Sequence, residues 1–368
     1  MKKYCWWVLF VFFLSCKKDQ AGESFIPLPL PKGINVMEQG AKGDGINDDG
    51  PAFEKAMTLA NSMKLPVIIP IGNYRANILI PYDGIELIGQ GQPTASFKTG
   101  TIIIGAINCN NKKNILLQHL GINATENITA AALISGDGED SVDLNHLYDH
   151  ISLLGSGYRQ LSHGILCQTG RKINIKNIIV KNFYHGIALR SGDIHVDSVE
   201  AISCGFTSIV IKSASGKNIH TANINVNHVK IQGNADNPYD RGGMILIQSF
   251  DEKSITEDIS VNSVFSKFGG LSAISIAQEK GLIRNIKITN CVASYQGHEA
   301  SSACYDIKGG TDILLSNCSS IRAFGTGFRC TGETKNVRVE QCYESGSGVR
   351  AWSGSFSYLQ LNGEEIIK

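Results

Sequence analysis

A six-residue phrase that repeats along most of the chain constrains the fold more than any other feature. Its pattern is apolar-x-apolar-x-polar, ending in an apolar or small residue, and it recurs about every 28 residues: ILLQHL from Ile115, HLYDHI from His146, INIKNI from Ile173, IHVDSV from Ile194, INVNHV from Ile224, ISVNSV from Ile259, IKITNC from Ile286, ILLSNC from Ile313 and VRVEQC from Val337. Apolar residues at alternate positions are typical of a strand with one buried side. Because such a strand cannot bury that side alone, its regular return predicts one coil of a solenoid per repeat.

A second, shorter strand phrase follows most copies of the first: GILCQ from Gly164, GIALR from Gly186, SIVIK from Ser208, MILIQ from Met244, AISIA from Ala273, CYDIK from Cys304, GFRCT from Gly327 and GVRAW from Gly348. Strands stacked coil on coil form long parallel sheets with an inward and an outward side. The leucine and asparagine pattern of leucine-rich repeats and their helices are absent, which favours a parallel β-helix of about nine or more coils. One inward column is expected to contain Ile178, Val199, Val229, Val264, Cys291, Cys318 and Cys342.

The segment before the repeats has a different character. GAKGDGINDDGPAFEKAM, from Gly40, contains a glycine-rich turn and then Asp48, Asp49 and Pro51. An Asp N-cap with a proline in the first turn predicts a helix near residues 51–62, and such a helix would cover the open end of the coils.

This opening, followed by VIIPIGNY from Val67, resembles that of the pectate-lyase-like superfamily. The shared pattern is GA-x-GDG-x-x-DD, a helix and a PxGxY strand, and the coil repeat extends the resemblance to about residue 360. The resemblance implies an all-β, right-handed parallel β-helix and, in most members, activity on glycans. The paired-aspartate and Gly-His-Gly signatures of polygalacturonases and the DPHE phrase of mannuronan epimerases are missing, so neither subfamily is assigned.

The first sixteen residues predict export. Lys2 and Lys3 precede an apolar run of about nine residues, which is far shorter than the roughly 20 needed to span a bilayer, as in a signal peptide. The run ends in Phe-Leu-Ser-Cys16, which resembles a lipobox and implies a lipid anchor at Cys16 in the bacterial outer membrane. The expected organisation is a signal peptide (1–16), a flexible tether (17–33), a cap with the first coils (34–100) and the β-helix body with a C-terminal cap (101–368).

The net charge bears on nucleic-acid binding, and the positions of the cysteines bear on disulfide formation. A net charge of +1 provides no electrostatic footprint for nucleic acid. Cys291, Cys318 and Cys342 end the same repeated phrase, which predicts a stack of reduced, buried thiols rather than a disulfide framework. Similarly, His119, His150 and His228 share a turn column with Asn and Gln residues, so we interpret them as structural rather than metal-binding.

Two features indicate a glycan-binding groove on one side. The chain between paired phrases is longer at three places, near residues 155–162, 233–243 and 294–303. Insertions into a solenoid form loops that are often on the binding face. We expect these loops to emerge from one side and to contribute the substrate-binding candidates Tyr158, Arg159, Asp240, Arg241, His298 and Glu299.

The outward positions of the short strands are the second feature. One column is expected to hold Gln168, Arg190, Lys212, Gln248, Ala277 and Lys308, with Asp306 and Arg329 in the next column and His163 and His185 in the one before. Adjacent coils are about 4.8 Å apart, so the charge of Arg190 is expected to lower the pKa of Lys212.

These residues favour a polysaccharide lyase acting on a uronic-acid-containing glycan. Lys212 is the candidate base at C5, Arg190, Lys308 and Arg329 are candidate carboxylate clamps, and His185 or Tyr184 would protonate the leaving oxygen. No cofactor is required. Calcium replaces arginine in many related lyases, and Asp306 with Asp240 or Glu299 would be its ligands here, although they form no convincing acidic cluster.

Two alternatives stay open. A glycoside hydrolase needs two carboxyl groups about 5–9 Å apart, and Asp240, Glu299 and Asp306 are its candidates. A non-catalytic glycan-binding lipoprotein would instead rely on clustered aromatic side chains, for which Tyr158, Tyr184, Tyr239 and Tyr295 are available.

Overall fold

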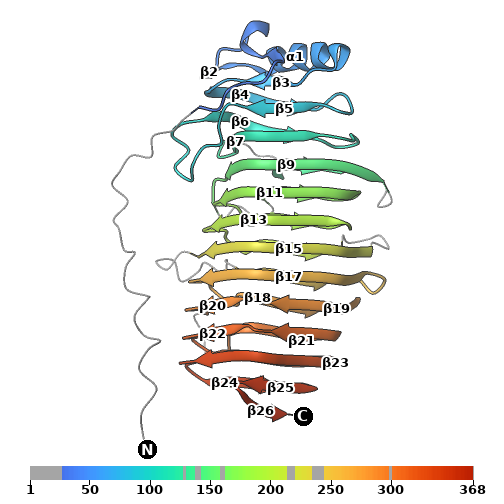
Figure 1. Ribbon diagram of the computed structural model, residues 1–368, viewed down its shortest axis with the longest axis vertical. Helices are drawn as coiled ribbons and strands as arrows, with labels where there is room; N and C mark the ends of the chain where they lie inside the picture. Colours follow the sequence, from blue (N-terminus) through green and yellow to red (C-terminus); the bar gives the residue numbers. More distant parts are fainter. Residues whose placement is uncertain are drawn as a thin grey trace, which may run out of the picture.

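The coils predicted from the repeats form a right-handed parallel β-helix in a computed structural model of the chain (Figure 1). The structure describes residues 27–126, 130–136, 142–157, 162–213, 220–233, 244–297 and 301–367. Through most of the stack, a strand pairs in parallel with the strand one coil further along, so that strands two apart in sequence are neighbours in space. Two layers result, which we name the long-strand layer and the short-strand layer.

The long-strand layer carries the first repeated phrase. Its strands are β1 (Ile34–Asn35), β3 (Val67–Ile69), β5 (Glu86–Gly89), β7 (Leu116–Asn123), β9 (Asp143–Leu154), β11 (Arg171–Lys181), β13 (Ile194–Ile202), β15 (His220–Gln232), β17 (Ile255–Lys267), β19 (Leu282–Thr289), β20 (Val292–Ser294), β22 (Ser319–Ile321) and β25 (Tyr358–Leu361), together with the second halves of β21 (Ala303–Ser316) and β23 (Thr326–Ser345).

The short-strand layer carries the second phrase. It contains β2 (Asp44–Asp48), β4 (Gly72–Leu79), β6 (Thr101–Asn108), β8 (Ala131–Ser135), β10 (His163–Cys167), β12 (His185–Leu189), β14 (Thr207–Lys212), β16 (Ile245–Ser249), β18 (Ile274–Gln278), the first halves of β21 and β23, and β24 (Arg350–Gly354). A final strand, β26 (Glu364–Ile367), pairs antiparallel with β25.

The interior is one continuous apolar core, and the predicted inward column is confirmed. Ile178 lies opposite Val199, Val199 opposite Val229, and Val229 opposite Val264. The register of the next coils extends the column to the three cysteines, and all seven side chains belong to the same buried cluster. The eight cysteines among the described residues are buried thiols that form no disulfide with one another, as predicted.

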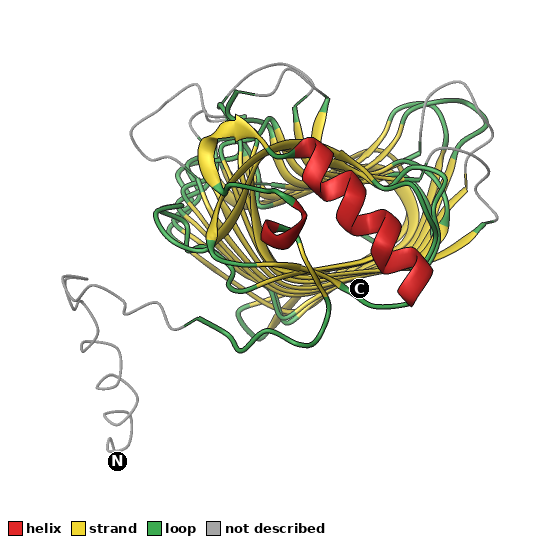
Figure 2. Ribbon diagram, turned by 90° about the horizontal axis from the view of Figure 1, so that it is seen from above, coloured by secondary structure: helices red, strands yellow, loops and turns green. Residues whose placement is uncertain are grey.

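A helix covers one end of the stack, close to where the sequence placed it. Helix α1 (Gly50–Met63) lies across the end of the coils (Figure 2) and buries Phe53, Met57 and three alanines against them. A short 3-10 turn, η1 (Met37–Gln39), precedes β2. No helix among the described residues is both long and apolar enough to cross a membrane.

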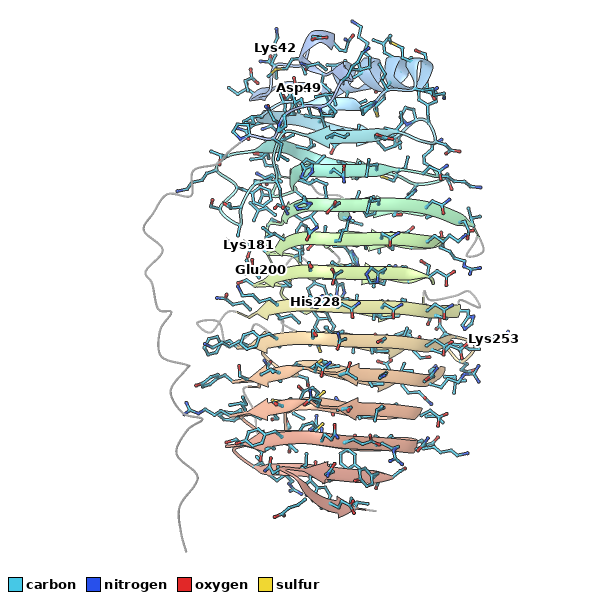
Figure 3. All side chains as sticks on the ribbon, viewed as in Figure 1. Lys42, Asp49, Lys181, Glu200, His228 and Lys253 are labelled. Carbon is cyan, nitrogen blue, oxygen red and sulfur yellow. The ribbon has the colours of Figure 1, made fainter. Side chains whose placement is uncertain are left out.

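Asp49 lies at the N-cap position as predicted, but its side chain does not cap the helix. Asp49 precedes α1 but makes no side-chain hydrogen bond to the helix. Its buried carboxylate instead accepts hydrogen bonds from the backbone N–H groups of Lys42, at 2.6 Å, and Gly43, at 3.3 Å (Figure 3 labels Lys42 and Asp49 near this end). The aspartate therefore fixes the preceding glycine-rich turn rather than the helix.

A column of left-handed backbone at one corner explains the three histidines. His119, His150 and His228 have φ values of 55°, 54° and 50° and share this conformation with Asn177, Asn290, Asn317 and Gln341. Asn is among the residues that adopt this region most readily. His119 and His150 are closer than the sequence suggested, with ring centroids 4.7 Å apart, but His150 is paired with Asp149. The described residues contain no group of three side chains arranged to hold a metal ion.

Candidate functional site

A groove lies along the outward side of the short-strand layer. It has a volume of about 590 Å³, and its lining includes Phe206, Leu246, Ser275, Glu279, Asp306, Lys308 and Arg329. Part of this outward side is unexpectedly apolar, because Leu166, Ala188, Val210 and Leu246 form a second buried cluster there. Of these four residues only Leu246 lines the groove, whose other end is lined by the charged residues Asp306, Lys308 and Arg329.

The outward column predicted from the short phrases is confirmed. Lys212 lies opposite Gln248, Gln248 opposite Ala277, and Ala277 opposite Lys308. Arg190 follows Leu189, which pairs with Ile211, so Arg190 and Lys212 are neighbours on adjacent coils.

Arg190 and Lys212 form a cationic pair that no carboxylate neutralises within the described residues. Burial lowers the pKa of both side chains, and the charge of Arg190 lowers the pKa of Lys212 further, against a smaller opposing effect of Glu279. Arg190 Nη2 lies 3.5 Å from His163 Nε2, and the buried Nε of Arg190 has no hydrogen-bond partner in the part of the chain that the structure describes. The direction that the sequence predicted for Lys212 is thus confirmed, but burial is the larger cause.

A histidine and aromatic cluster borders this pair. The rings of His163 and His185 are 5.0 Å apart, and Tyr184 stacks on Phe206 at 5.3 Å. Burial, followed by the nearby His163, lowers the pKa of His185 to about 3. His185 is therefore a neutral imidazole near pH 7, which argues against the proton-donor role predicted for it and leaves Tyr184 as the candidate.

Asp306 forms ion pairs with two of the residues predicted to bind the substrate carboxylate. Its side chain is only 2% exposed and accepts hydrogen bonds from Arg329 Nε at 2.7 Å and Arg329 Nη2 at 2.6 Å. Lys308 Nζ lies 3.0 Å from the same carboxylate. Both predicted clamps therefore contact an internal carboxylate, and their binding of a substrate carboxylate stays a prediction. The other two calcium-ligand candidates, Asp240 and Glu299, lie outside the described residues, so a calcium site stays a prediction.

Comparison with known proteins identifies the family. A family model described as rhamnogalacturonase A/epimerase, pectate lyase-like, matches residues 33–233. The chain belongs to this family. The match covers the capped end and the first coils, including β10, β12 and β14, which carry His163, His185, Arg190 and Lys212.

Solved structures share the fold of this family at low sequence identity. The A-module of a mannuronan C-5 epimerase from Azotobacter vinelandii is 14% identical, with a TM-score of 0.55 over 89% of this chain and 98% of that one. An exopolygalacturonase from Thermotoga maritima is 10% identical, with a TM-score of 0.53 over 89% and 93%. A surface adhesin of Streptococcus pneumoniae is 11% identical, with a TM-score of 0.54 over 88% and 92%. No curated protein matches the sequence.

Sequence reasoning missed one charged residue of the groove in this family member. Glu279 lines the groove and accepts a hydrogen bond from Gln248 Nε2 at 2.6 Å. Glu279 directly follows β18 and is two residues after the outward-facing Ala277. Because alternate residues of a strand face the same side, extending the AISIA phrase by two residues predicts that Glu279 also faces outward.

Several predicted residues lie outside the described part of the chain. Tyr158, Arg159, Tyr239, Asp240, Arg241, His298 and Glu299 belong to this group, as does the lipidation candidate Cys16. The placement of the three loops around one groove, and the lipid anchor, stay predictions. Among their described flanks, Ser301 and Ser302 do line the groove.

Proposed function

We propose that the chain binds an acidic, uronate-containing polysaccharide along the outward side of the short-strand layer and cleaves it by β-elimination. The polymer would extend from the groove to Arg190 and Lys212, which do not line the groove themselves but adjoin it through Gln248. The observation that carries this proposal is the half-buried pair of Arg190 and Lys212 on the outward side of the short-strand layer. A buried cation without an anionic partner is unfavourable, so the pair favours a ligand that supplies negative charge. The family description includes an epimerase, and glycan-active enzymes share the fold, which supports a polysaccharide as that ligand.

The two cations have different tasks in this reaction. Arg190 is held beside His163 and would bind the uronate carboxylate through its planar guanidinium. Lys212 would act as the base, because its lowered pKa increases the neutral fraction that can accept the C5 proton. As the proton leaves C5, negative charge develops on the carboxylate, where Arg190 stabilises it. The C4–O bond then breaks, a C4–C5 double bond forms, and the leaving oxygen takes a proton from Tyr184 or water.

An assay of a polysaccharide panel tests the proposal directly. The wild-type chain should release products with the ultraviolet absorbance of an unsaturated uronate, because elimination creates a conjugated double bond. Lys212→Ala should lose at least about a thousandfold in kcat/KM with an unchanged fold, since an outward position adds little to stability. Lys212→Arg should not restore turnover, because the arginine stays protonated. Lys287→Ala, an exposed outward lysine of the long-strand layer, is the matched control.

Other outcomes would redirect the assignment. Full activity in Lys212→Ala would remove this residue as the base. Reducing ends without ultraviolet absorbance would indicate hydrolysis and focus attention on Glu279 and the candidate Asp240. Binding without any product would favour a glycan-binding protein. Exchange of the C5 hydrogen with solvent without cleavage would indicate an epimerase, which shares the first proton transfer.

A further inference from the structure

A second hollow lies at the corner where strands of the long-strand layer turn toward the short-strand layer. It has a volume of about 620 Å³ and is lined by Tyr295, Gln296, Gly297, Arg322, Ala323, Phe324, Gly348 and Val349. Its large side chains are exposed, with Tyr295 at 41%, Phe324 at 55% and Val349 at 46%. None of these lining residues is acidic, so the hollow is apolar with a positive charge from Arg322.

The Tyr295 ring in this hollow is held in place. Arg322 Nη1 donates a hydrogen bond to Tyr295 Oη at 2.8 Å, and its guanidinium lies 5.5 Å from the ring centre. Phe268 contacts the ring from the preceding coil, with centroids 5.4 Å apart, and Lys267 Nζ lies over Phe268 at 4.6 Å. An exposed aromatic ring fixed in this way loses little conformational entropy when a ligand packs on it.

The backbone beneath this cluster is unusual for its residues. Phe268, Tyr295 and Arg322 occupy one corner position in successive coils and have φ values of 58°, 53° and 53°. Earlier coils place Asn182, Ser203 and Gly233 at this position, and a later one places Gly346. Positive φ is uncommon for bulky side chains, so these three coils keep aromatic and cationic groups outside at an energetic cost.

We propose that this aromatic corner is a second glycan-binding site, which takes a sugar ring of the same acidic polysaccharide outside the groove. The C–H face of a pyranose ring would pack on Tyr295 and Phe324, as apolar surfaces pack on aromatic rings. Arg322 and Lys267 would attract the uronate carboxylates. The identity of the polymer rests on the proposed function, whereas the aromatic stacking does not.

The location of the corner suits a long polymer. One connecting segment contributes to both cavities, since Tyr295, Gln296 and Gly297 line the hollow while Ser301 and Ser302 line the groove. The proposal places one polymer in contact with both cavities. A second contact on one polymer raises the overall affinity because the second binding event is intramolecular. A short oligosaccharide would not gain this advantage.

Affinity electrophoresis of the full chain tests the proposal, with polygalacturonate or alginate in the gel and dextran as the neutral reference. At least one acidic polymer should retard the wild-type chain. Tyr295→Ala/Phe324→Ala should bind that polymer about tenfold more weakly, while its kcat/KM on a tetrasaccharide of the same sugar stays within about twofold. Phe250→Ala is the matched control, because Phe250 is 48% exposed at a different corner and should leave retardation unchanged.

The outcomes separate this site from the chemistry in the groove. Lys212→Ala should be retarded in the gel as strongly as the wild type. The binding measurement can therefore be interpreted even if the proposed elimination does not occur. Equal retardation of the double variant and the wild type would overturn the proposal, as would a wild-type chain that neither acidic polymer retards. A mass in sedimentation that halves in the double variant would also overturn it, because a second copy of the chain would then occupy the hollow. Circular dichroism of each variant verifies that the fold is intact.

Discussion

Replacing Arg329 by methionine tests whether the charged end of the groove is structural. Arg329 donates two hydrogen bonds to Asp306 and a third to the backbone oxygen of Ser301, and its pKa is raised mainly by the contact with Asp306. Methionine has a similar length but no donor. Asp306, which is 2% exposed, would then keep only Lys308, whose own side chain is mostly in solvent.

The expected loss of stability follows from this geometry. Removing one partner of a buried ion pair costs about 3–5 kcal/mol, and the remaining Lys308 places Arg329→Met at the lower end, about 3 kcal/mol. Unfolding entropy of about 2.1 cal/mol/K per residue gives roughly 0.7 kcal/mol/K for the folded part of this chain. Arg329→Met should therefore lower Tm by about 4 °C in differential scanning calorimetry.

A double variant supplies the control for this experiment. Asp306→Asn/Arg329→Met replaces the unpaired carboxylate with a neutral amide, so it should recover more than half of the lost Tm. A decrease below about 1 °C in Arg329→Met would refute the reasoning. So would a double variant that is no more stable than the single one, because the cost would then not come from an unpaired charge.

Two further predictions concern titration and thiol chemistry. His185 has an ordinary pKa of 6.5 when unfolded and about 3 when folded, so the unfolded state takes up the proton first as the pH falls. The contribution of neutral His185 to the free energy of unfolding is complete above pH 6.5, and it decreases toward pH 3 by about 1.4 kcal/mol per pH unit. His185→Gln removes this titration, so its Tm should depend less on pH between pH 6.5 and pH 3. Burial raises the pKa of Cys109, Cys167 and Cys304 to about 12, so Ellman's reagent should react with the eight described thiols only after unfolding in guanidinium. In a Cys5→Ser/Cys16→Ser background, a rapid native reaction would contradict their burial.

The coil register could be predicted from the sequence because it depends on a local period. Alternation assigns each residue of a strand to one side, and the repeated phrase aligns equivalent residues from coil to coil. This was sufficient to place Val229 against Val264 inside the helix and Lys212 against Gln248 outside it. It also placed the capping helix to within a residue or two at each end.

The partners of individual side chains in the groove were harder to predict. Asp306 and Arg329 occupy equivalent positions in the CYDIK and GFRCT phrases and lie directly opposite one another, so their ion pair follows from the same register. This ion pair is not apparent when only like charges within the neighbouring column are compared. The burial of His185 depends instead on residues packed over the outward side of the layer, such as Phe206, and strand alternation carries no information about those contacts.

The two ends of the stack determine how far it can grow. A parallel coil presents unpaired backbone groups at each end, and these could accept the end of another molecule and start a fibre. Helix α1 blocks one end with a different type of structure, while β26 reverses direction against β25 and presents Glu364 and Glu365 to solvent. An arriving coil would meet either a helix or an antiparallel, negatively charged edge. Both described ends of the stack therefore disfavour end-to-end association, although a parallel coil by itself would permit it.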